Sequence, residues 1–432
     1  MSETKKMSII TNLSHLETDK VDSINADLVI PVEKTKYNKF SQPVSIYAFS
    51  LNPDNTVCVP FAYAIEVLSL PRRDRTSFTQ RNPIFTGTLR DQQVDVFTEA
   101  KNKLSKYGFT MLSLPTGFGK TFLSIKLSTT TKLKTLIIVN KIVLMNQWEE
   151  SINKVCPSAS IQVLKKQEPM KDCDFFIINA INIPKKGRDY FKDIGTVIVD
   201  ECHLIMAENL SKCLQYLSPR YLIGLSATPY RTDGMDSLIA FYFGEDKIIK
   251  LLFRKHKVYK VLTHFSPTFD YTADGKVNWG SLLDSQCNDM KRNELIIQIV
   301  KREKSRNILI LSKRIEQGNF LFNRLKEENE NVTSLIGKQQ DFDKNARILV
   351  GTTSKCGTGF DFPKLDCLIL ASDIQQYYIQ ALGRVLRRPD VEPIVYDLVD
   401  NNPILSHHYE NRADVYRQVG GTIEVVSSSK LK

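Results

Sequence analysis

The sequence lacks the features that would assign it to a membrane or secreted protein. No stretch approaches the roughly 18 consecutive apolar residues of a membrane-spanning helix, and the opening residues MSETKKMSII contain no signal-peptide core. The eight cysteines are scattered and form no C-x-x-C pair, which excludes the spacing of a zinc site and the density of a disulfide scaffold. These absences predict a soluble, intracellular protein with reduced thiols.

Internal repeats and low-complexity segments are absent too, so neither a solenoid nor a disordered chain is indicated. The 432 residues suffice for two or three domains. Lys and Arg number 59 against 48 Asp and Glu, a net charge of +11. That excess suits a polyanionic partner such as nucleic acid, although a basic protein without such a partner has the same composition.

Alternating short strands and helices predict an α/β protein with parallel sheets. Four apolar, β-branched runs in the first half are typical of buried parallel strands: 135–139, 175–179, 197–200 and 221–226. Five more follow at 307–311, 332–335, 347–350, 367–371 and 393–397, and helical stretches such as 144–155 and 210–217 separate the strands. Ligands of such sheets bind at the carboxyl ends of the strands.

The predicted boundaries give four segments. Residues 1–85 form a small β-rich accessory domain whose first 20 residues are polar and expected to be loose. Residues 86–245 form the first α/β domain, 246–290 a basic connector and 291–432 a second α/β domain without a phosphate loop. Four arginines before the first α/β domain either touch phosphates or lie on a solvated linker: Arg72, Arg73, Arg75 and Arg81.

Residues 112–121, LSLPTGFGKT, have the pattern of a phosphate-binding loop between a strand and a helix. Gly117 and Gly119 let backbone N–H groups turn toward phosphate oxygens at the positive end of the helix. Lys120 would reach the β- and γ-phosphates, and Thr121 would hold Mg²⁺. The match is partial because Leu114 stands where the pattern G-x-x-x-x-G-K-[ST] has Gly.

Two adjacent carboxylates, Asp200 and Glu201, end a predicted strand 80 residues after Lys120. Asp200 can hold Mg²⁺ through water, and Glu201 can orient and deprotonate an attacking water. Adjacent acids also occur at ordinary surface turns, but their place after the phosphate loop favours a role in phosphoryl transfer.

The motifs together resemble those of superfamily 2 helicases, in the same order along the chain. DECH at 200–203 resembles the D-E-x-H box. LRDQQ at 89–93 resembles the glutamine segment before the phosphate loop, and GLSATP at 224–229 resembles the S-A-T motif. Residues 140–148 resemble the segment that grips the nucleic-acid backbone. The later helicase motifs have similar counterparts in this chain, at residues 308–314 and 352–361 and in QALGRVLR at 380–387. The resemblance covers roughly residues 86–400.

The resemblance implies two tandem RecA-like domains and a helicase or translocase driven by ATP and Mg²⁺. It assigns hydrolysis to Lys120, Asp200, Glu201, Gln380, Arg384 and Arg387. It assigns ATP binding to Gln93 (with Gln92 as an alternative), Thr116, Gly117, Gly119, Lys120, Thr121, Gly359 and Asp361, and Mg²⁺ to Thr121 and Asp200. Nucleic-acid contacts fall on Lys141, Gln147, Thr228, Arg231 and Thr353.

Five further side chains are candidates for a structural or a functional role. Trp148 either stacks on a base or, as is more common for such an aromatic, packs in the domain. His203 is expected to couple the acidic box to Ser226 or to the second domain, and Cys202 to pack beneath the box. The adjacent histidines His407 and His408 are expected to be structural, because no further Cys or His lies at the spacing of a zinc site.

TPYRTDG at 228–234 is similar to a stretch of the group that includes XPB, UvsW and helicases of large DNA viruses, among them the poxvirus transcript-release helicase. This implies a monomeric motor moving 3′→5′, on DNA or alternatively RNA, with transcription or replication machinery as partners. The implied location is the cytoplasm or a viral replication compartment, or packaging in the virion. Two alternatives stay open: a double-strand translocase that releases transcripts or proteins, and a nucleic-acid-binding scaffold whose affinity ATP gates.

Overall fold

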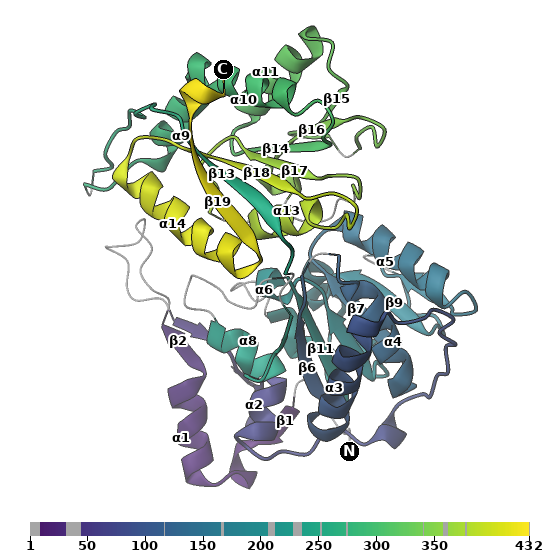
Figure 1. Cartoon of the computed structure of the whole chain (residues 1–432). Helices are drawn as coiled ribbons and strands as arrows, with labels where there is room; N and C mark the ends of the chain where they lie inside the picture. Colours follow the sequence, from purple (N-terminus) through teal and green to yellow (C-terminus); the bar gives the residue numbers. More distant parts are fainter. Residues whose placement is uncertain are drawn as a thin grey trace. The chain divides into compact units, whose positions relative to one another are not determined.

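The chain forms two compact units, the first ending at Lys250 and the second beginning at Leu251. This computed structural model describes residues 9–31, 45–115, 117–165, 168–205, 212–227, 236–250, 253–273, 275–339, 341–356, 362–375 and 378–431 (Figure 1). Within these ranges, every helix is too short or too polar to cross a bilayer.

The first unit contains a seven-stranded parallel sheet in the order β12-β6-β11-β10-β7-β9-β8. Its strands are β6 (Phe109–Ser113), β7 (Thr135–Val139), β8 (Ile161–Val163), β9 (Phe175–Asn179), β10 (Thr196–Val199), β11 (Tyr221–Ser226) and β12 (Ile248–Ile249). The four runs expected in this half, and the strand entering the phosphate loop, are all present.

Helices cover both faces of this sheet, so its strands are apolar throughout. Along β7, Leu136 and Ile138 belong to the core on one face, and Ile137 and Val139 to the core on the other. The second of these cores contains α3 (Asp91–Tyr107), α4 (Lys120–Thr131) and α5 (Ile142–Val155). The first contains α6 (Cys202–Ile205), η6 (Lys212–Tyr216), α8 (Asp236–Phe243) and the N-terminal region.

The N-terminal region is built onto the first α/β domain. It comprises β1 (Ile9–Asn12), α1 (Thr18–Asp27), β2 (Val29–Pro31), β3 (Ser45–Tyr47), β4 (Ser50–Leu51), β5 (Thr56–Val59) and α2 (Phe61–Glu66) (Figure 1). Its sheets are small and antiparallel. The expectation that residues 1–20 are loose is wrong from Ile9 onward, because β1 pairs with β5 and α1 begins at Thr18.

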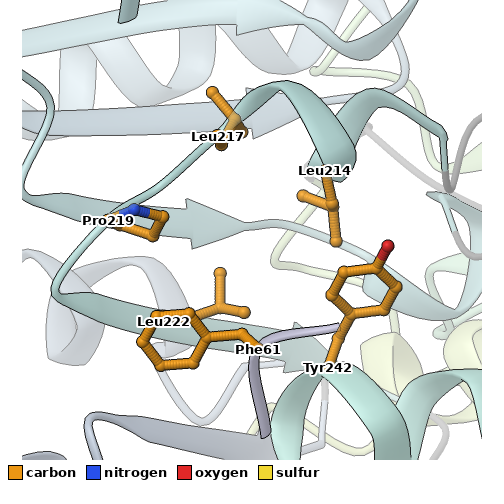
Figure 2. Close-up of a pocket in the computed structure, with 6 residues that line it drawn as sticks. All are labelled: Phe61, Leu214, Leu217, Pro219, Leu222 and Tyr242. Atoms are coloured by element: carbon orange, nitrogen blue, oxygen red, sulfur yellow. The ribbon is translucent and has the colours of Figure 1, made fainter. Parts of the chain in front are cut away.

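A small apolar pocket lies where α2 meets the α/β domain (Figure 2). It is lined by Phe61, Leu214, Leu217, Pro219, Leu222 and Tyr242. Its interior of about 10 Å³ is no larger than the space that one water needs. The Phe61 ring also meets the Phe109 ring of β6 edge to face, with centroids 6.4 Å apart. The pocket is therefore a packing gap in a close junction rather than a ligand site.

The arginines before the α/β domain bind the protein itself. Arg73 donates to the carbonyls of Lys192 and Ser218, at 3.0 Å each, and its guanidinium lies 4.1 Å from the Phe78 ring centroid. Arg75 donates to the carbonyl of Thr131 at 2.8 Å. Arg72 likewise donates to the backbone of α3, and Arg81 pairs with Asp172. The interpretation of this segment as a solvated linker is wrong, because its arginines hold it against the first unit.

The second unit contains another seven-stranded parallel sheet, in the order β15-β16-β14-β17-β18-β13-β19. Its strands are β13 (His256–Leu262), β14 (Ile308–Ser312), β15 (Val332–Leu335), β16 (Ile348–Thr352), β17 (Cys367–Leu370), β18 (Ile394–Val399) and β19 (Gly421–Ser427). Its helices are α9 (Trp279–Asn288), α10 (Met290–Arg302), α11 (Ile315–Glu327), α12 (Thr353–Cys356), α13 (Tyr378–Val385) and α14 (Pro403–Gln418).

All five strands expected in the second half are present, and β13 and β19 are added to them. β13 lies within residues 246–290, for which the sequence predicts a connector, and pairs with β18 and β19. The predicted fold class of two RecA-like parallel-sheet domains with a small β-rich N-terminal region is confirmed. The exact domain boundaries stay predictions.

A buried ionic cluster joins α14 to the strands of the second sheet. Arg412 donates to both carboxylate oxygens of Asp397, at 2.8 Å each, and to Asp373 at 2.9 Å. The Tyr416 hydroxyl donates to Asp397 at 2.9 Å, and His408 Nδ1 lies 2.7 Å from Asp373. The expectation that the histidine pair is structural is confirmed for His408. In the described part of the chain, no group of three or more acidic, His and Cys side chains is arranged to hold a metal ion.

Replacing Arg412 with Ala is expected to lower the free energy of unfolding of the second unit by about 3–5 kcal/mol, because two buried carboxylates lose their cation. Thermal unfolding of the variant measures this loss. Arg417→Ala is the matched control: it lies on the same helix, its side chain is 57% exposed, and its ion pair with Asp414 is at the surface. Equal melting temperatures for the two variants would contradict a stabilising role for the buried cluster.

Candidate nucleotide site and nucleic-acid contacts

The phosphate loop connects β6 to α4. Gly119 is the N-cap of α4 with φ +90°, and Gly117 has φ +86°; both values are in the left-handed region that favours glycine. A Cβ on Gly119 would lie 2.5 Å from Gln93 Nε2, so a larger residue would also have to displace the Gln93 amide. Leu114 is buried, and its N–H donates to the Ser226 carbonyl at 3.0 Å. The departure at this position is therefore accommodated by the sheet.

Lys120 is the first residue of α4, and its ammonium donates to the carbonyl of Leu114 at 3.0 Å. The ammonium thus lies over the loop from which it is expected to reach phosphate oxygens. Thr121 follows in the first turn of the helix and is half-buried. Thr116, the remaining loop residue of the predicted set, lies outside the described residues.

Gln93 lies beneath the loop and is 2% exposed. Its side-chain oxygen accepts the backbone N–H of Arg90 at 2.8 Å, and its side-chain nitrogen donates to the carbonyl of Phe118 at 2.7 Å. Gln92, the alternative, is exposed. The structure thus brings Gln93 to the loop, and its contact with adenine stays a prediction.

The two carboxylates follow β10 at the same sheet edge. Asp200 is 8% exposed; its Oδ1 accepts the Glu201 N–H at 2.9 Å and its Oδ2 accepts the Trp148 indole N–H at 2.9 Å. Burial and then the charge of Glu201 raise the pKa of Asp200 to about 6, against the lowering effects of the Trp148 bond and of Lys120. A cation bound beside this carboxylate would favour its charged form and lower its pKa again.

Glu201 has one carboxylate oxygen, Oε2, that is buried and has no hydrogen-bond partner among the described residues. His203 Nδ1 is 3.5 Å from this oxygen, too far for a hydrogen bond of normal length. The backbone of Glu201 adopts φ +47°, which is uncommon for a residue with a side chain. Such strain occurs often where a side chain must point in one direction for function.

His203 connects the acidic box to the S-A-T motif. Its Nδ1 lies 2.9 Å from the Ser226 hydroxyl, at the end of the neighbouring strand β11. The predicted coupling of His203 to Ser226 is confirmed. Cys202 is fully buried, as expected, and burial raises the pKa of its thiol well above its usual value.

Of the predicted nucleic-acid contacts, Lys141 and Gln147 lie on α5. Lys141 is the N-cap of this helix, two residues after the end of β7, and Gln147 is half-buried on the second turn. β6, β11, β10 and β7 are consecutive parallel strands, so the loop, the S-A-T motif, the acidic box and Lys141 follow neighbouring strand ends. Thr228 and Arg231 lie outside the described residues.

In the second unit, Gln380 and Arg384 lie on α13, and Arg387 follows the helix. Gln380 is 3% exposed, and its Oε1 has no hydrogen-bond partner in the described part of the chain. Arg384 is 4% exposed and donates to the backbone carbonyl of Cys356. Arg387 is half-buried. Thr353 begins α12 at the end of β16, whereas Gly359 and Asp361 lie outside the described residues.

Trp148 is the residue whose place in the site could not be read from the motifs. It is 1% exposed, so the packing interpretation is correct and base stacking is wrong. Its bond to Asp200 was not predicted. One sequence feature could have placed Trp148 near the acidic box: it lies in α5 two helical turns after Lys141, on the side of the helix that faces the sheet.

The residues present fit a nucleoside triphosphate and Mg²⁺. Positive-φ glycines open the loop backbone, and a lysine ammonium lies over it. The buried Glu201 oxygen, which lacks a partner among the described residues, is a ready acceptor for a water proton, and the buried Asp200 carboxylate is matched to a cation. This donor set, of carboxylate and hydroxyl oxygens, is the type that Mg²⁺ prefers.

Comparisons with known proteins agree with this site. A sequence profile described as Type III restriction enzyme, res subunit, matches residues 86–231. Putative helicase 161L of Invertebrate iridescent virus 6 is 42% identical over 448 aligned residues, covering 97% of this chain and 99% of the relative. Transcript termination protein A18 of Yaba-like disease virus is 25% identical, covering 67% of each chain.

Among solved structures, a variant of S. cerevisiae Dbp5 bound to RNA and ADP BeF3 is similar in fold, with a TM-score of 0.56 and 12% identity. The match covers 79% of this chain and 93% of that one.

The fold and the loop define a P-loop ATPase with two RecA-like domains. With 161L as a relative along nearly its whole length, the chain belongs to the DExH-box helicases of superfamily 2.

Proposed function

We propose that this helicase-family ATPase is a motor that moves 3′→5′ along DNA and separates its strands. The observation that carries the proposal is the order of sites at the carboxyl edge of the first sheet. The phosphate loop, Ser226, the acidic box and Lys141 follow four neighbouring strands, so nucleotide and nucleic acid would share one rigid sheet. The net charge of +11 supports a polyanionic partner.

In this proposal Lys120 and the loop backbone bind the triphosphate, while Gln93 supports the loop from below and contacts adenine. Thr116, Gly117, Gly119, Gly359 and Asp361 complete the predicted nucleotide contacts. Thr121 and Asp200 hold Mg²⁺, which when bound would neutralise charge on the phosphates. Glu201 orients the attacking water and accepts its proton at Oε2, which has no partner among the described residues.

The second unit supplies Gln380, Arg384 and Arg387 to hydrolysis. Arg387 stabilises negative charge on the γ-phosphoryl group, as arginine fingers do. Arg384, which is buried and bonded to the Cys356 carbonyl, ties α13 to the end of α12 and contributes to the reaction as well. Dependence of hydrolysis on residues of both units would couple ATP turnover to their relative motion.

Strand contacts are proposed at Lys141, Gln147, Thr228, Arg231 and Thr353. A motor that translocates must bind every sequence, so contacts to the phosphate backbone are the expected mode. Because 161L and A18 are virus proteins, we propose a role in viral transcription, repair or replication within the infected cell.

A second function is release of transcripts from duplex DNA without strand separation. It is favoured by the relative A18, whose name is Transcript termination protein. Both functions use the same ATPase site and differ only in what the moving motor displaces.

Two displacement assays separate these functions. The first uses a duplex with a single-stranded 3′ tail, with the matched 5′-tailed duplex as control. The second uses a triplex-forming strand on blunt duplex DNA. We expect ATP-dependent displacement from the 3′-tailed substrate. Displacement of the triplex strand alone would favour the transcript-release function, and displacement of neither strand with intact ATPase activity would favour an ATP-gated scaffold.

A further inference from the structure

A hydrogen bond joins α5 directly to the acidic box. The Trp148 indole Nε1–H donates to Asp200 Oδ2 at 2.9 Å, and both side chains are buried, at 1% and 8% exposure. Leu144, Met145 and Ile152 are buried on the same helix, so the indole is held in a packed environment. A buried bond between a neutral donor and a carboxylate is among the stronger kinds of hydrogen bond in proteins.

This bond fixes the direction of the Asp200 carboxylate. The other oxygen, Oδ1, accepts the backbone N–H of Glu201 at 2.9 Å, so one donor comes from the box itself and the other from α5. A shift of α5 would therefore rotate or release the carboxylate. Outer donors of this kind commonly orient the groups that bind a metal ion.

The start of α5 carries the proposed strand contact. Lys141 is the N-cap of the helix, and Ile142 beside it is 73% exposed. Lys141 and Trp148 are seven residues apart, which is two turns of helix and about 10 Å along its axis. One rigid helix thus carries a surface contact at its start and the Asp200 donor two turns later.

We propose that Trp148 is a positioning residue that transmits nucleic-acid binding at the start of α5 to the Asp200 carboxylate. Strand binding at Lys141 and Ile142 shifts or stiffens α5, and the indole N–H aligns Asp200 for its cation. The inference rests on the proposed function, because it explains how strand binding raises the rate of ATP hydrolysis.

Indole NMR tests the link without relying on catalysis. The chain has only two tryptophans, so ¹⁵N-indole labelling gives two resonances, which a Trp279→Phe variant assigns. We expect the Trp148 resonance to be shifted downfield by the carboxylate, and to move upfield in Asp200→Asn. Adding a single-stranded DNA oligonucleotide, with no nucleotide, is expected to shift the Trp148 resonance in the wild type and not in Lys141→Glu. A Trp148 resonance unaffected by saturating DNA would overturn the inference.

Kinetics of Trp148→Phe supply the second test, since Phe keeps an aromatic ring in the core and removes the N–H. We expect kcat at saturating DNA to fall by about 10–100-fold, with the Kd for DNA unchanged. Trp279→Phe, in the second unit, controls for loss of an indole and is expected to keep the wild-type kcat.

The two possible failures are distinguishable. A wild-type ATPase that DNA does not stimulate would contradict the proposed function. A stimulated wild type and an equally stimulated Trp148→Phe variant would overturn only the role of Trp148.

Discussion

Glu201→Gln is expected to lower kcat for ATP hydrolysis by about 10²–10⁴-fold while nucleotide affinity stays near the wild-type value. The buried Oε2 of Glu201 has no hydrogen-bond partner among the described residues, which leaves it available to accept a proton from water. Gln has the same size and can adopt the same backbone conformation, but its amide is not a base. Steady-state ATPase kinetics and equilibrium binding of a fluorescent ADP analogue measure the two quantities.

The matched control is Glu327→Gln on α11, where the glutamate side chain is 69% exposed. We expect this variant to hydrolyse ATP at the wild-type rate. A Glu201→Gln variant that kept a kcat close to that of the wild type would show that another group accepts the proton, and His203, 3.5 Å from Oε2, would be the next residue to replace.

Arg387→Ala is expected to have the larger effect, a fall in kcat of about 10³–10⁵-fold, which is the range for arginine fingers in related NTPases. Its position three residues after Arg384 puts both arginines at one end of α13, but their surroundings differ. Arg384 is 4% exposed and bonded to the Cys356 carbonyl, so its loss is expected to lower stability as well as rate. Arg387→Ala is expected to lower kcat with little change in melting temperature.

Arg388→Ala is the control for Arg387. Arg388 donates to Asp366 at 3.0 Å and pairs with Asp390, so its interactions lie within its own unit. We expect Arg388→Ala to change melting temperature more than kcat. If Arg387→Ala and Arg388→Ala reduced kcat equally, the assignment of Arg387 to the γ-phosphate would be contradicted.

The strands of both sheets were predictable where they are buried on both faces. Runs such as 135–139 and 308–312 are continuous and β-branched because helices cover both sides of the sheet. β13 is not predicted, because Lys257 and Lys260 interrupt the apolar residues of HKVYKVL and the segment is rich in basic residues, which favours a connector. β19 lies at the sheet edge and exposes Thr422, Glu424 and Val425, so it lacks that continuous pattern.

The parts of the site that could be predicted are those whose residues are contiguous in the sequence. Loop glycines, Lys120 and the carboxylate pair are contiguous in sequence, and their chemistry follows from residue type. The Trp148–Asp200 bond joins residues 52 positions apart, and the contact of Gln93 with Phe118 joins residues 25 apart. Such pairs are set by how α3 and α5 pack on the sheet, which a single sequence does not encode in any local pattern.

The partners of the four arginines between positions 72 and 81 could not be predicted for the same reason. Their charge suggests phosphates or solvent, but Arg72, Arg73 and Arg75 donate to backbone carbonyls and Arg81 pairs with Asp172. The carbonyls are those of Leu104, Thr131, Lys192 and Ser218. Those carbonyls become available only when the first domain is folded, so no charge pattern in the sequence could identify them as partners.

The most direct test of the central claim is the ATPase rate in the presence of single-stranded DNA, duplex DNA, a forked junction and RNA, with Lys120→Ala as the blank. The account predicts strong stimulation by DNA, greatest for the form on which the motor moves, and loss of turnover in Lys120→Ala. Stimulation by RNA alone would assign the motor to RNA. Equal turnover with and without every nucleic acid would contradict a nucleic-acid motor.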